Sequence, residues 1–328
     1  MNRRQLITGI LSAAALAKIT LAGARTTWPS KPIKLIVPYP AGGGTDFFAR
    51  QVAPGMGEAL GQPVIVENRP GASGLIGGQA VATLNQADGY TILLGDMTTY
   101  AVNPTLLKKQ QQYDVQKDLA PLTLGAKFDF LLVVNPMVLP ATSVQDIVAA
   151  AATAPGGLNY ASPGIGTTHH LAMEMFARET HAKLVAVHYR GGAPAVQDLL
   201  GGRVGLMFLD YATARQYVES GRLDAIATAG DQRIAAYPDL PTLAELGVKN
   251  FSVEGWQGLT ARAGTPEPVI RALAAAYAKS IANPETRGRL SEAGIKPAAS
   301  SPAEFGSFIE AETARWRKVI LEQNINAE

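Results

Sequence analysis

The sequence predicts an α/β fold, and three observations carry that prediction. Short apolar runs of strand length recur along the chain, segments with helical spacing lie between them, and glycine-rich turns join several strands to the next helix. The runs are continuously apolar rather than alternating, which is typical of strands that are covered on both faces. We therefore expect a mostly parallel sheet with right-handed crossovers.

The expected strands and helices alternate in order along the chain. The strands are the runs IKLIVP, PVIVEN, YTILLG, FLLVVN, LNYASP, LVAVHY, VGLMFL and LDAIATAG. The helices between them are expected at residues 45–60, 73–84, 144–153, 167–180, 193–200 and 212–220. Two longer helices, at residues 266–281 and 302–323, close the chain, and each begins with a proline suited to a first turn.

The first helix is less regular than the others. Its apolar stripe has i, i+4 spacing and consists of Phe48, Val52, Met56 and Leu60. Pro54, Gly55 and Gly57 interrupt this stripe, so we expect a kink or a break there.

Residues 1–24 are predicted to be an export signal. Arg3 and Arg4 precede an apolar core at residues 6–17, and Ala22 and Ala24 fit a cleavage site for small residues. That core is shorter than the ~20 residues of a membrane-spanning helix. The paired arginines leave both the Sec and the twin-arginine routes open. We expect the mature protein to leave the cytoplasm.

Composition excludes several classes of protein. The 328 residues are 47% hydrophobic and 17% charged, with a formal net charge of +2 and no cysteine. The absence of a clustered basic segment argues against a nucleic-acid partner. Without cysteine, neither a disulfide nor a lipid-modified thiol is available, so we expect a soluble protein stabilised by its core. In a cell with two membranes, that location is the periplasm.

The stretch VPYPAGGGTDFFAR, residues 37–50, predicts an anion site at a helix N-terminus. A Walker A loop requires lysine after its last glycine, whereas here Thr45 and Asp46 follow Gly44. A dinucleotide fingerprint requires a third glycine, and Phe47 occupies that position. Because Asp46 would repel a polyphosphate, we interpret the loop as a cradle for a single carboxylate.

The same arrangement of strand, glycine-rich turn and helix recurs later. It appears in NYASPGIGTTHHLAMEMF and again in VHYRGGAPAVQDLL. A ligand that meets two helix N-termini gains the dipole contribution twice, each worth about 0.3–1 kcal/mol when exposed. No linker or repeat divides the chain into independent domains. We therefore expect two lobes joined by crossing strands, with one carboxylate cradle on each lobe and the two cradles facing each other.

Six motifs resemble one known family over nearly the whole mature chain. They are WPSKPIKLIVPYPAGGGTDFFAR, GQPVIVENRPGASGLIG, DGYTILLGDMTTYAVNP, YASPGIGTTHHLA, VHYRGGAPAVQDLLGGRVGLMF and PDLPTLAELGV. In this order they resemble the Bug family, the periplasmic solute-binding proteins of tripartite tricarboxylate transporters. The resemblance implies a two-lobed type II periplasmic binding protein fold with a ligand cleft between the lobes. With it we expect lobe 1 at residues 25–127 and 254–328, and lobe 2 at residues 128–253.

The resemblance also implies which residues contact the ligand. In that family a ligand carboxylate is held between the two cradle loops. On this chain the matching positions are Tyr39, Pro40, Ala41, Gly42, Gly43, Thr45 and Asp46 in the first loop, and Ser162, Gly164, Gly166, Thr167 and His170 in the second. Two departures from the family pattern are His169 and the turn GDMTTYA, which contains Asp96 and Met97.

Several of these residues have a structural alternative. Asp46 either receives a ligand group or caps its own helix, and Thr45 and Thr167 are expected N-caps that also offer a hydroxyl. Ser73 lies at an expected helix start and Asp210 follows a strand, so each either caps a helix or contacts the cleft. Further along the chain, Arg190 is expected to brace its loop through an ion pair, with a second ligand carboxylate as the alternative. Trp256 is expected to pack where the chain returns to lobe 1, with contact to the ligand as the alternative.

No metal site is expected, although His169, His170 and Glu174 lie close together in the sequence. The chain has only four histidines, no thiolate and no H-E-x-x-H spacing. Ser73 lacks the G-x-S-x-G elbow of a hydrolase, and no triad partners can be assigned to it.

The function predicted from the sequence is capture of a small organic carboxylate and its delivery to integral membrane transporter subunits. We expect a monomer without a cofactor and without enzymatic activity. Two alternatives stay open: a hydrolase-like enzyme that acts on a carboxylated substrate, and a ligand-sensing co-receptor of a membrane signalling protein. The sequence does not identify the carboxylate.

Overall fold

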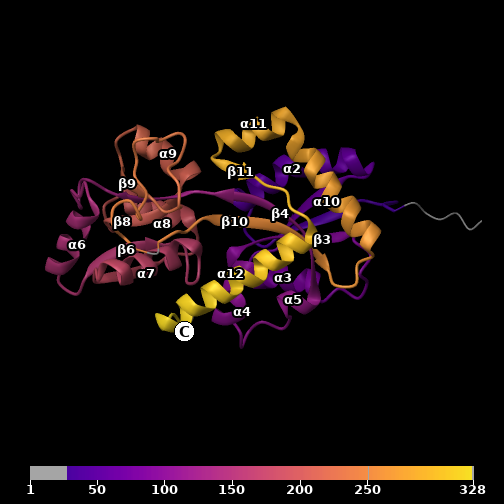
Figure 1. Ribbon diagram of the computed structural model, residues 1–328, viewed down its shortest axis with the longest axis horizontal. Helices are drawn as coiled ribbons and strands as arrows, with labels where there is room; N and C mark the ends of the chain where they lie inside the picture. Colours follow the sequence, from indigo (N-terminus) through magenta and orange to yellow (C-terminus); the bar gives the residue numbers. More distant parts are fainter. Residues whose placement is uncertain (1–27, 250, 327–328) are drawn as a thin grey trace, which may run out of the picture.

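The computed structural model describes residues 28–249 and 251–326, so the predicted export signal lies outside the described residues. Two sheets organise the chain. A six-stranded sheet has the order β11-β4-β10-β3-β1-β2, and a five-stranded sheet has the order β7-β6-β8-β5-β9. We call the part built on the six-stranded sheet lobe 1 and the part built on the five-stranded sheet lobe 2. Figure 1 shows the two lobes side by side, with β4 and β10 running between them.

The strands of lobe 1 combine both directions. They are β1 (Ile33–Val37), β2 (Val64–Asn68), β3 (Thr91–Asp96), β4 (Leu119–Phe128), β10 (Gly255–Arg262) and β11 (Ile295–Pro297). Strand β1 pairs in parallel with β2 and β3, whereas β10 is antiparallel to both β3 and β4. The short β11 is antiparallel to β4 at the edge of the sheet.

Lobe 2 is mixed in the same way. Its strands are β5 (Phe130–Val134), β6 (Leu158–Ser162), β7 (Leu184–His188), β8 (Leu206–Asp210) and β9 (Asp224–Thr228). Strand β6 pairs in parallel with β7 and β8, while β5 is antiparallel to β8 and β9. All the strands expected from the apolar runs are present, but the prediction of a mostly parallel sheet is wrong.

The antiparallel pairs arise where the chain crosses between the lobes. Only Asp129 separates β4 from β5, so the chain runs straight out of one sheet into the other. Strand β10 begins beside the end of β4, because Gly255 pairs with Phe128. The parallel strands of each sheet have their carboxyl ends facing the other lobe. A strand that enters the sheet from that other lobe is therefore antiparallel to them. The runs of β4 and β10 were missed because Pro121, Gly125 and Gln257 interrupt their apolar pattern.

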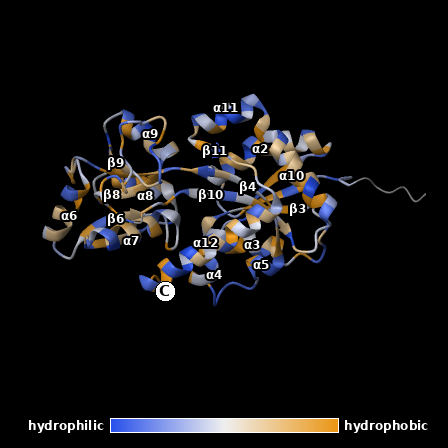
Figure 2. Ribbon diagram, viewed as in Figure 1, coloured by the Kyte–Doolittle hydropathy of each residue, from blue (hydrophilic) through white to orange (hydrophobic). Residues whose placement is uncertain are grey.

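Helices cover both sheets, and most begin and end close to the expected residues. They are α2 (Gly44–Leu60), α3 (Leu75–Ala82), α4 (Asn103–Leu106), α5 (Val115–Asp118), α6 (Val144–Thr153), α7 (Thr168–Thr180), α8 (Gly192–Leu200), α9 (Tyr211–Glu219), α10 (Glu267–Ala282), α11 (Pro284–Glu292) and α12 (Pro302–Glu322). The 3₁₀ turn η1 (Ala72–Gly74) precedes α3, and the π-helical turn η2 (Thr98–Val102) precedes α4. Figure 2 shows apolar residues along strands β6, β8 and β9 and polar residues on the outer helix α11. Within the described ranges, no helix has the length and apolar character to cross a membrane.

Helix α2 runs unbroken through Pro54, so the predicted break is absent. The two helices α2 and α10 pack closely at Gly55. A Cβ added there would lie 2.6 Å from the Oγ of Ser280 on α10. That hydroxyl donates a hydrogen bond of 2.7 Å to the carbonyl oxygen of Val52. The glycine therefore serves helix packing rather than helix termination.

Helix α12 lies against both lobes. Near its middle, Trp316 is fully buried, and Glu312 accepts a hydrogen bond of 2.8 Å from the indole of Trp256 on β10. Trp256 itself is 2% exposed, as expected for a residue in the returning chain. At the end of α12, the carboxylate of Glu322 lies 2.7 Å from the guanidinium of Arg178 on α7. Figure 1 shows this end of α12 close to α7.

Candidate ligand-binding site

The carboxyl ends of the parallel strands meet between the two lobes. In lobe 1 the chain leaves β1 into residues 38–43, β2 into residues 69–71 and β3 at Asp96. In lobe 2 it leaves β6 into residues 163–167, β7 into residues 189–191 and β8 at Asp210. Because β4 runs with β1 and passes directly into β5, which opposes β8, these two sets of ends face each other. Ligands bind at such strand ends in open α/β sheets.

The loop at residues 38–43, which we call the first loop, presents exposed backbone at the start of α2. Pro40, Ala41, Gly42, Gly43 and Gly44 are all exposed. The N-cap is Gly43, which has no side chain to accept from the first turn. The prediction that Thr45 caps this helix is therefore wrong, because the helix begins one residue earlier. The N–H groups of this first turn are available to an external acceptor.

Neither backbone conformation nor packing requires glycine at positions 43 and 44. A Cβ added at Gly44 would meet nothing within 4 Å, and one at Gly43 would meet only the carbonyl oxygen of Pro40, at 3.6 Å. Neither residue has a positive φ. A glycine that neither conformation nor packing demands is consistent with a group outside the chain approaching the backbone closely.

Asp46 holds the first loop in place through hydrogen bonds from its buried side. Its Oδ2 accepts hydrogen bonds of 2.9 Å from the N–H of Gly42 and from the Nε of Arg50, and its Oδ1 accepts one of 2.9 Å from the amide of Asn68. The residue is only 3% exposed. Burial raises the pKa of this carboxyl, but the hydrogen bonds from Arg50, Gly42 and Asn68 outweigh it and lower the pKa to about 2. Both oxygens are thus engaged within the protein.

The loop at residues 163–167, the second loop, is bonded largely to itself. Ser162 is fully buried, and its hydroxyl donates to the carbonyl oxygen of Gly164 at 2.9 Å. Thr167 is the N-cap of α7, as predicted, and its hydroxyl donates to the same carbonyl at 2.8 Å. Gly166 has a φ of +74°, and a Cβ there would lie 2.2 Å from Leu106 of lobe 1. The side chains of this loop therefore fix its shape.

His170 lies beneath the second loop and is 5% exposed. Its Nδ1 accepts a hydrogen bond of 3.1 Å from the N–H of Gly166. The ring stacks on Tyr160 and packs edge-on against His188. Burial, with the charge of His188 as a smaller cause, lowers the pKa of His170 to about 4. The imidazole is therefore neutral at pH 7 and holds the loop as an acceptor.

Asp210 performs a capping role at the start of α9. Its Oδ2 accepts from the N–H and the hydroxyl of Thr213. Its Oδ1 lies 3.7 Å from the Nε2 of His169. Burial raises the pKa of Asp210, but the hydrogen bonds and the charge of His169 reverse this and lower it. The Nδ1 of His169 is buried and has no hydrogen-bond partner among the described residues.

Ser73 and Tyr39 belong to a polar region at the end of β3. Tyr39 donates its hydroxyl to the Oδ1 of Asp96 at 2.7 Å. Ser73 lies inside η1, with a φ of +51°, and so is not the cap of α3, which is Gly74. Asn103 donates to the carbonyl oxygen of Ser73 at 2.9 Å. The sequence reasoning missed Asn68 and Asn103, although Asn68 ends a predicted strand and that position was the available signal.

The turn after β7 supports the second loop through its backbone. The N–H of Tyr189 donates to the carbonyl oxygen of Ser162 at 2.8 Å, and that of Gly191 donates to Pro163 at 3.0 Å. Arg190, between them, is exposed. Within the part of the chain that the structure describes, it makes no salt bridge, so the expected ion pair is absent. The bracing comes from the two neighbouring amides instead.

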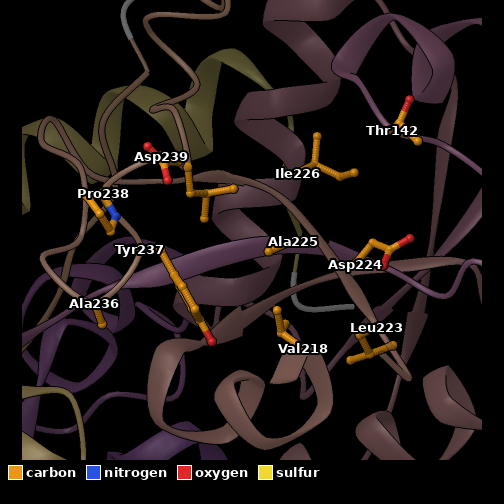
Figure 3. A pocket seen from close by; sticks show the side chains of 11 residues that line it. Thr142, Val218, Leu223, Asp224, Ala225, Ile226, Ala236, Tyr237, Pro238 and Asp239 are labelled. Carbon is orange, nitrogen blue, oxygen red and sulfur yellow. The ribbon is translucent and has the colours of Figure 1, made fainter. Parts of the chain in front are cut away.

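A separate hollow of about 600 Å³ lies on the opposite side of lobe 2. Figure 3 shows its lining, which includes Val218, Asp224 and Tyr237. Asp224 begins β9, and β9 runs in the same direction as β6 and β8. This hollow is therefore at the amino ends of the strands, away from both loops, and we do not assign the ligand to it. Among the described residues, no cluster of histidine and carboxylate side chains fits a metal ion.

Comparison with known proteins agrees with this architecture. The sequence model of the family described as "Tripartite tricarboxylate transporter family receptor" matches residues 48–325. The chain is 36% identical to a UPF0065 protein in the tcbD-tcbE intergenic region of Pseudomonas sp. (strain P51), over 100% of this chain and 96% of the relative. It is 34% identical to protein BugT of Bordetella pertussis, over 98% of both chains.

Solved structures share the fold at similar identity. A protein described as a periplasmic transporter is 36% identical with a TM-score of 0.83, and the match covers 92% of this chain and 100% of that chain. An R. palustris protein solved with adipate is 34% identical with a TM-score of 0.84, covering 91% and 99%. MatC from Rhodopseudomonas palustris, solved with bound malate, is 29% identical with a TM-score of 0.81, covering 89% and 100%. This chain belongs to the tripartite tricarboxylate transporter receptor family, which includes the Bug proteins.

Proposed function

We propose that this protein is a periplasmic solute-binding protein that captures a small organic carboxylate between its lobes. The observation that carries the proposal is the N-terminus of α2, where Gly43 leaves the first turn uncapped and exposed. Gly44 leaves the approach to that turn open. A carboxylate is satisfied by two or three amide donors at a helix N-terminus, and the dipole adds to the attraction. Two relatives were solved with adipate and malate, which are carboxylates.

The proposed contacts of the two loops differ in kind. In the first loop the backbone of Gly43 and Thr45 would donate to the ligand, with Tyr39, Pro40, Ala41 and Gly42 shaping the entrance, because the N–H of Gly42 already donates to Asp46. In the second loop the ligand would contact the surface formed by Gly164 and Gly166, whose N–H groups already donate to Ser162 and His170. Ser162, Thr167 and His170 hold the shape of this loop. Ser73 and Asp210 complete the proposed lining, while Asp46 supports the first loop from inside.

Closure of the lobes would occur at the crossing strands. We assign lobe 1 to residues 25–127 and 254–328 and lobe 2 to residues 128–253. At this boundary Lys127 pairs with Glu254 at 2.8 Å, and Lys296 pairs with Asp129 at 2.8 Å. A ligand that bridges the two loops binds the closed form more tightly and therefore shifts the population toward it.

The family supports a periplasmic location and delivery of the ligand to integral membrane transporter subunits. We further propose that the protein acts as a monomer. It performs no reaction, since the family is one of receptors. The hydroxyl of Ser162, which directly precedes the second loop, is buried and donates to Gly164, which does not suit attack on a substrate.

The direct test is a thermal-shift screen of carboxylates followed by calorimetry. A ligand at 100 times its dissociation constant stabilises the folded state by about 2.7 kcal/mol. We expect at least one small carboxylate to raise the melting temperature, with no effect from sugars or phosphate esters. If phosphate esters or sugars bind and no carboxylate does, the proposal is wrong. Turnover of the bound carboxylate by the purified protein would favour the enzyme alternative, and loss of uptake in a deletion strain separates transport from sensing.

A further inference from the structure

A compact polar cluster lies in lobe 1 where β3 ends, beside the first loop. We call it the Asp96 cluster, and it consists of Tyr39, Asp96, Thr99, Asn103 and the turn at residues 71–74. Its members are in mutual contact. A Cβ added at Gly74 would lie 2.6 Å from the Oγ1 of Thr99 and 3.2 Å from the hydroxyl of Tyr39. Asn103 reaches the same turn through the carbonyl oxygen of Ser73.

Asp96 brings an acceptor and a negative charge to this cluster. Its Oδ1 accepts from the hydroxyl of Tyr39 at 2.7 Å, and from the N–H and the hydroxyl of Thr99, each at 2.9 Å. All three bonds that Asp96 accepts within the described chain go to this one oxygen. No lysine or arginine of the described ranges forms a salt bridge with it. The residue as a whole is partly exposed.

Asn103 supplies a second acceptor without a partner. The residue is fully buried, and its Nδ2 donates to Ser73. Its Oδ1 has no hydrogen-bond partner among the described residues. A buried amide oxygen left unpaired is costly, and such groups in native structures call for an explanation. The backbone beside it is strained, since Ala72 and Ser73 have φ values of +46° and +51°.

The two ends of the site therefore differ in hydrogen-bond character. The N-terminus of α2 offers donors, whereas the Asp96 cluster offers the carboxylate of the partly exposed Asp96 as an acceptor, with the unpaired amide oxygen of Asn103 buried in the same cluster. A second carboxylate on the ligand would meet the like charge of Asp96 at the cluster. A hydroxyl or an ammonium group would instead donate to the carboxylate of Asp96.

We propose that the Asp96 cluster makes this protein select carboxylates whose far end is a hydrogen-bond donor, foremost a protonated amine, over simple dicarboxylates. The inference rests on the proposed function, because it presumes that the ligand carboxylate occupies the first loop. Burial raises the pKa of Asp96, with the hydrogen bonds from Thr99 and Tyr39 opposing that rise. A cationic ligand group supplies the charge partner that the protein does not.

The test compares three series of acids, each with members of four, five and six carbons. Acids of the same chain length are compared across the series. Each acid carries a carboxylate at one end and an amine, a hydroxyl or a second carboxylate at the other, as in 5-aminopentanoate, 5-hydroxypentanoate and glutarate. Calorimetry on the wild-type protein at pH 7 should give dissociation constants at least tenfold lower for the amines than for the matched dicarboxylates. This comparison needs no variant, so it stands even if a substitution impairs folding.

The variant Asp96→Asn keeps the shape of the side chain and an acceptor for Tyr39 and Thr99. It should weaken binding of the amine series at least tenfold and bind the dicarboxylates equally well or more tightly. Glu310→Gln is the matched control, because it removes one charge from an exposed position on α12 and should change nothing.

The outcomes separate this inference from the proposed function. Dicarboxylates that bind the wild type as tightly as the amines would overturn the inference and leave carboxylate capture intact. An Asp96→Asn variant with unchanged preference would do the same. If no acid of any kind binds, the proposed function fails together with the inference.

Discussion

The substitution Gly44→Ala tests the proposed site most sharply, because it should separate stability from binding. Gly44 is the first residue of α2, its φ is not positive, and a Cβ there would touch nothing within 4 Å. Alanine at a position that it can adopt without strain stabilises a protein by about 0.4–1 kcal/mol, mainly by restricting the unfolded chain. For a chain of this size that corresponds to a rise of about 2 °C in melting temperature.

Ligand affinity should change in the opposite direction. The added methyl group would stand beside the N–H donors that the carboxylate is proposed to use, so the ligand must retreat from them. A hydrogen bond to a charged group contributes about 1.5–3 kcal/mol. Loss of one such bond weakens binding about tenfold to a hundredfold, since each 1.4 kcal/mol is a factor of ten.

Two measurements on the same preparation check the prediction. Calorimetry with the tightest carboxylate from the screen gives the dissociation constant, and thermal unfolding without ligand gives the stability. Gly288→Ala is the matched control, since Gly288 is exposed on α11 and its added Cβ would also meet nothing within 4 Å. It should raise stability and leave affinity unchanged. A Gly44→Ala protein that binds as tightly as the wild type would refute the placement of the carboxylate at α2.

Three further predictions concern the groups that hold the two loops. Asp46→Ala removes the acceptor of three hydrogen bonds and should lower stability by about 2 kcal/mol with affinity retained; loss of affinity for only some carboxylates in titrations would instead show direct ligand contact. The pKa of His170 is lowered to about 4 from 6.5, so the unfolded chain binds the proton more readily, and the free energy of unfolding should fall by about 3 kcal/mol between pH 6.5 and 4. Urea titrations should show that decline flattened in His170→Gln, and an identical pH profile would contradict it. Gly166→Ala places a methyl group 2.2 Å from Leu106 at a φ of +74° and should lower the free energy of unfolding in urea by about 1–3 kcal/mol. Adding Leu106→Ala should restore the part of this loss that is due to the clash. If the loss in the double variant equals the sum of the losses in the two single variants, contact with Leu106 is not the cause.

The sequence by itself determined the local elements and the character of the first loop. Continuous apolar runs identified the strands from β1 to β9 apart from β4, because a run of apolar residues is a pattern local to each strand. Thr167 was identified as an N-cap, because capping depends on residues within one turn. The missing lysine after Gly44 excluded a nucleotide loop, because that chemistry needs a residue at a fixed offset.

Only the tertiary structure decided how those elements combine. It set β5 and β10 antiparallel to their neighbours, because the chain enters each sheet from the other lobe. Gly55 was expected to break α2 but serves contact with Ser280, which is far away in the sequence. His170 supports a loop from below, and Asn103 reaches the turn of Ser73. Such contacts join residues distant along the chain, so no local pattern predicts them. They exist because the hydrogen-bonding groups of each loop must be satisfied by whatever the fold brings beside them.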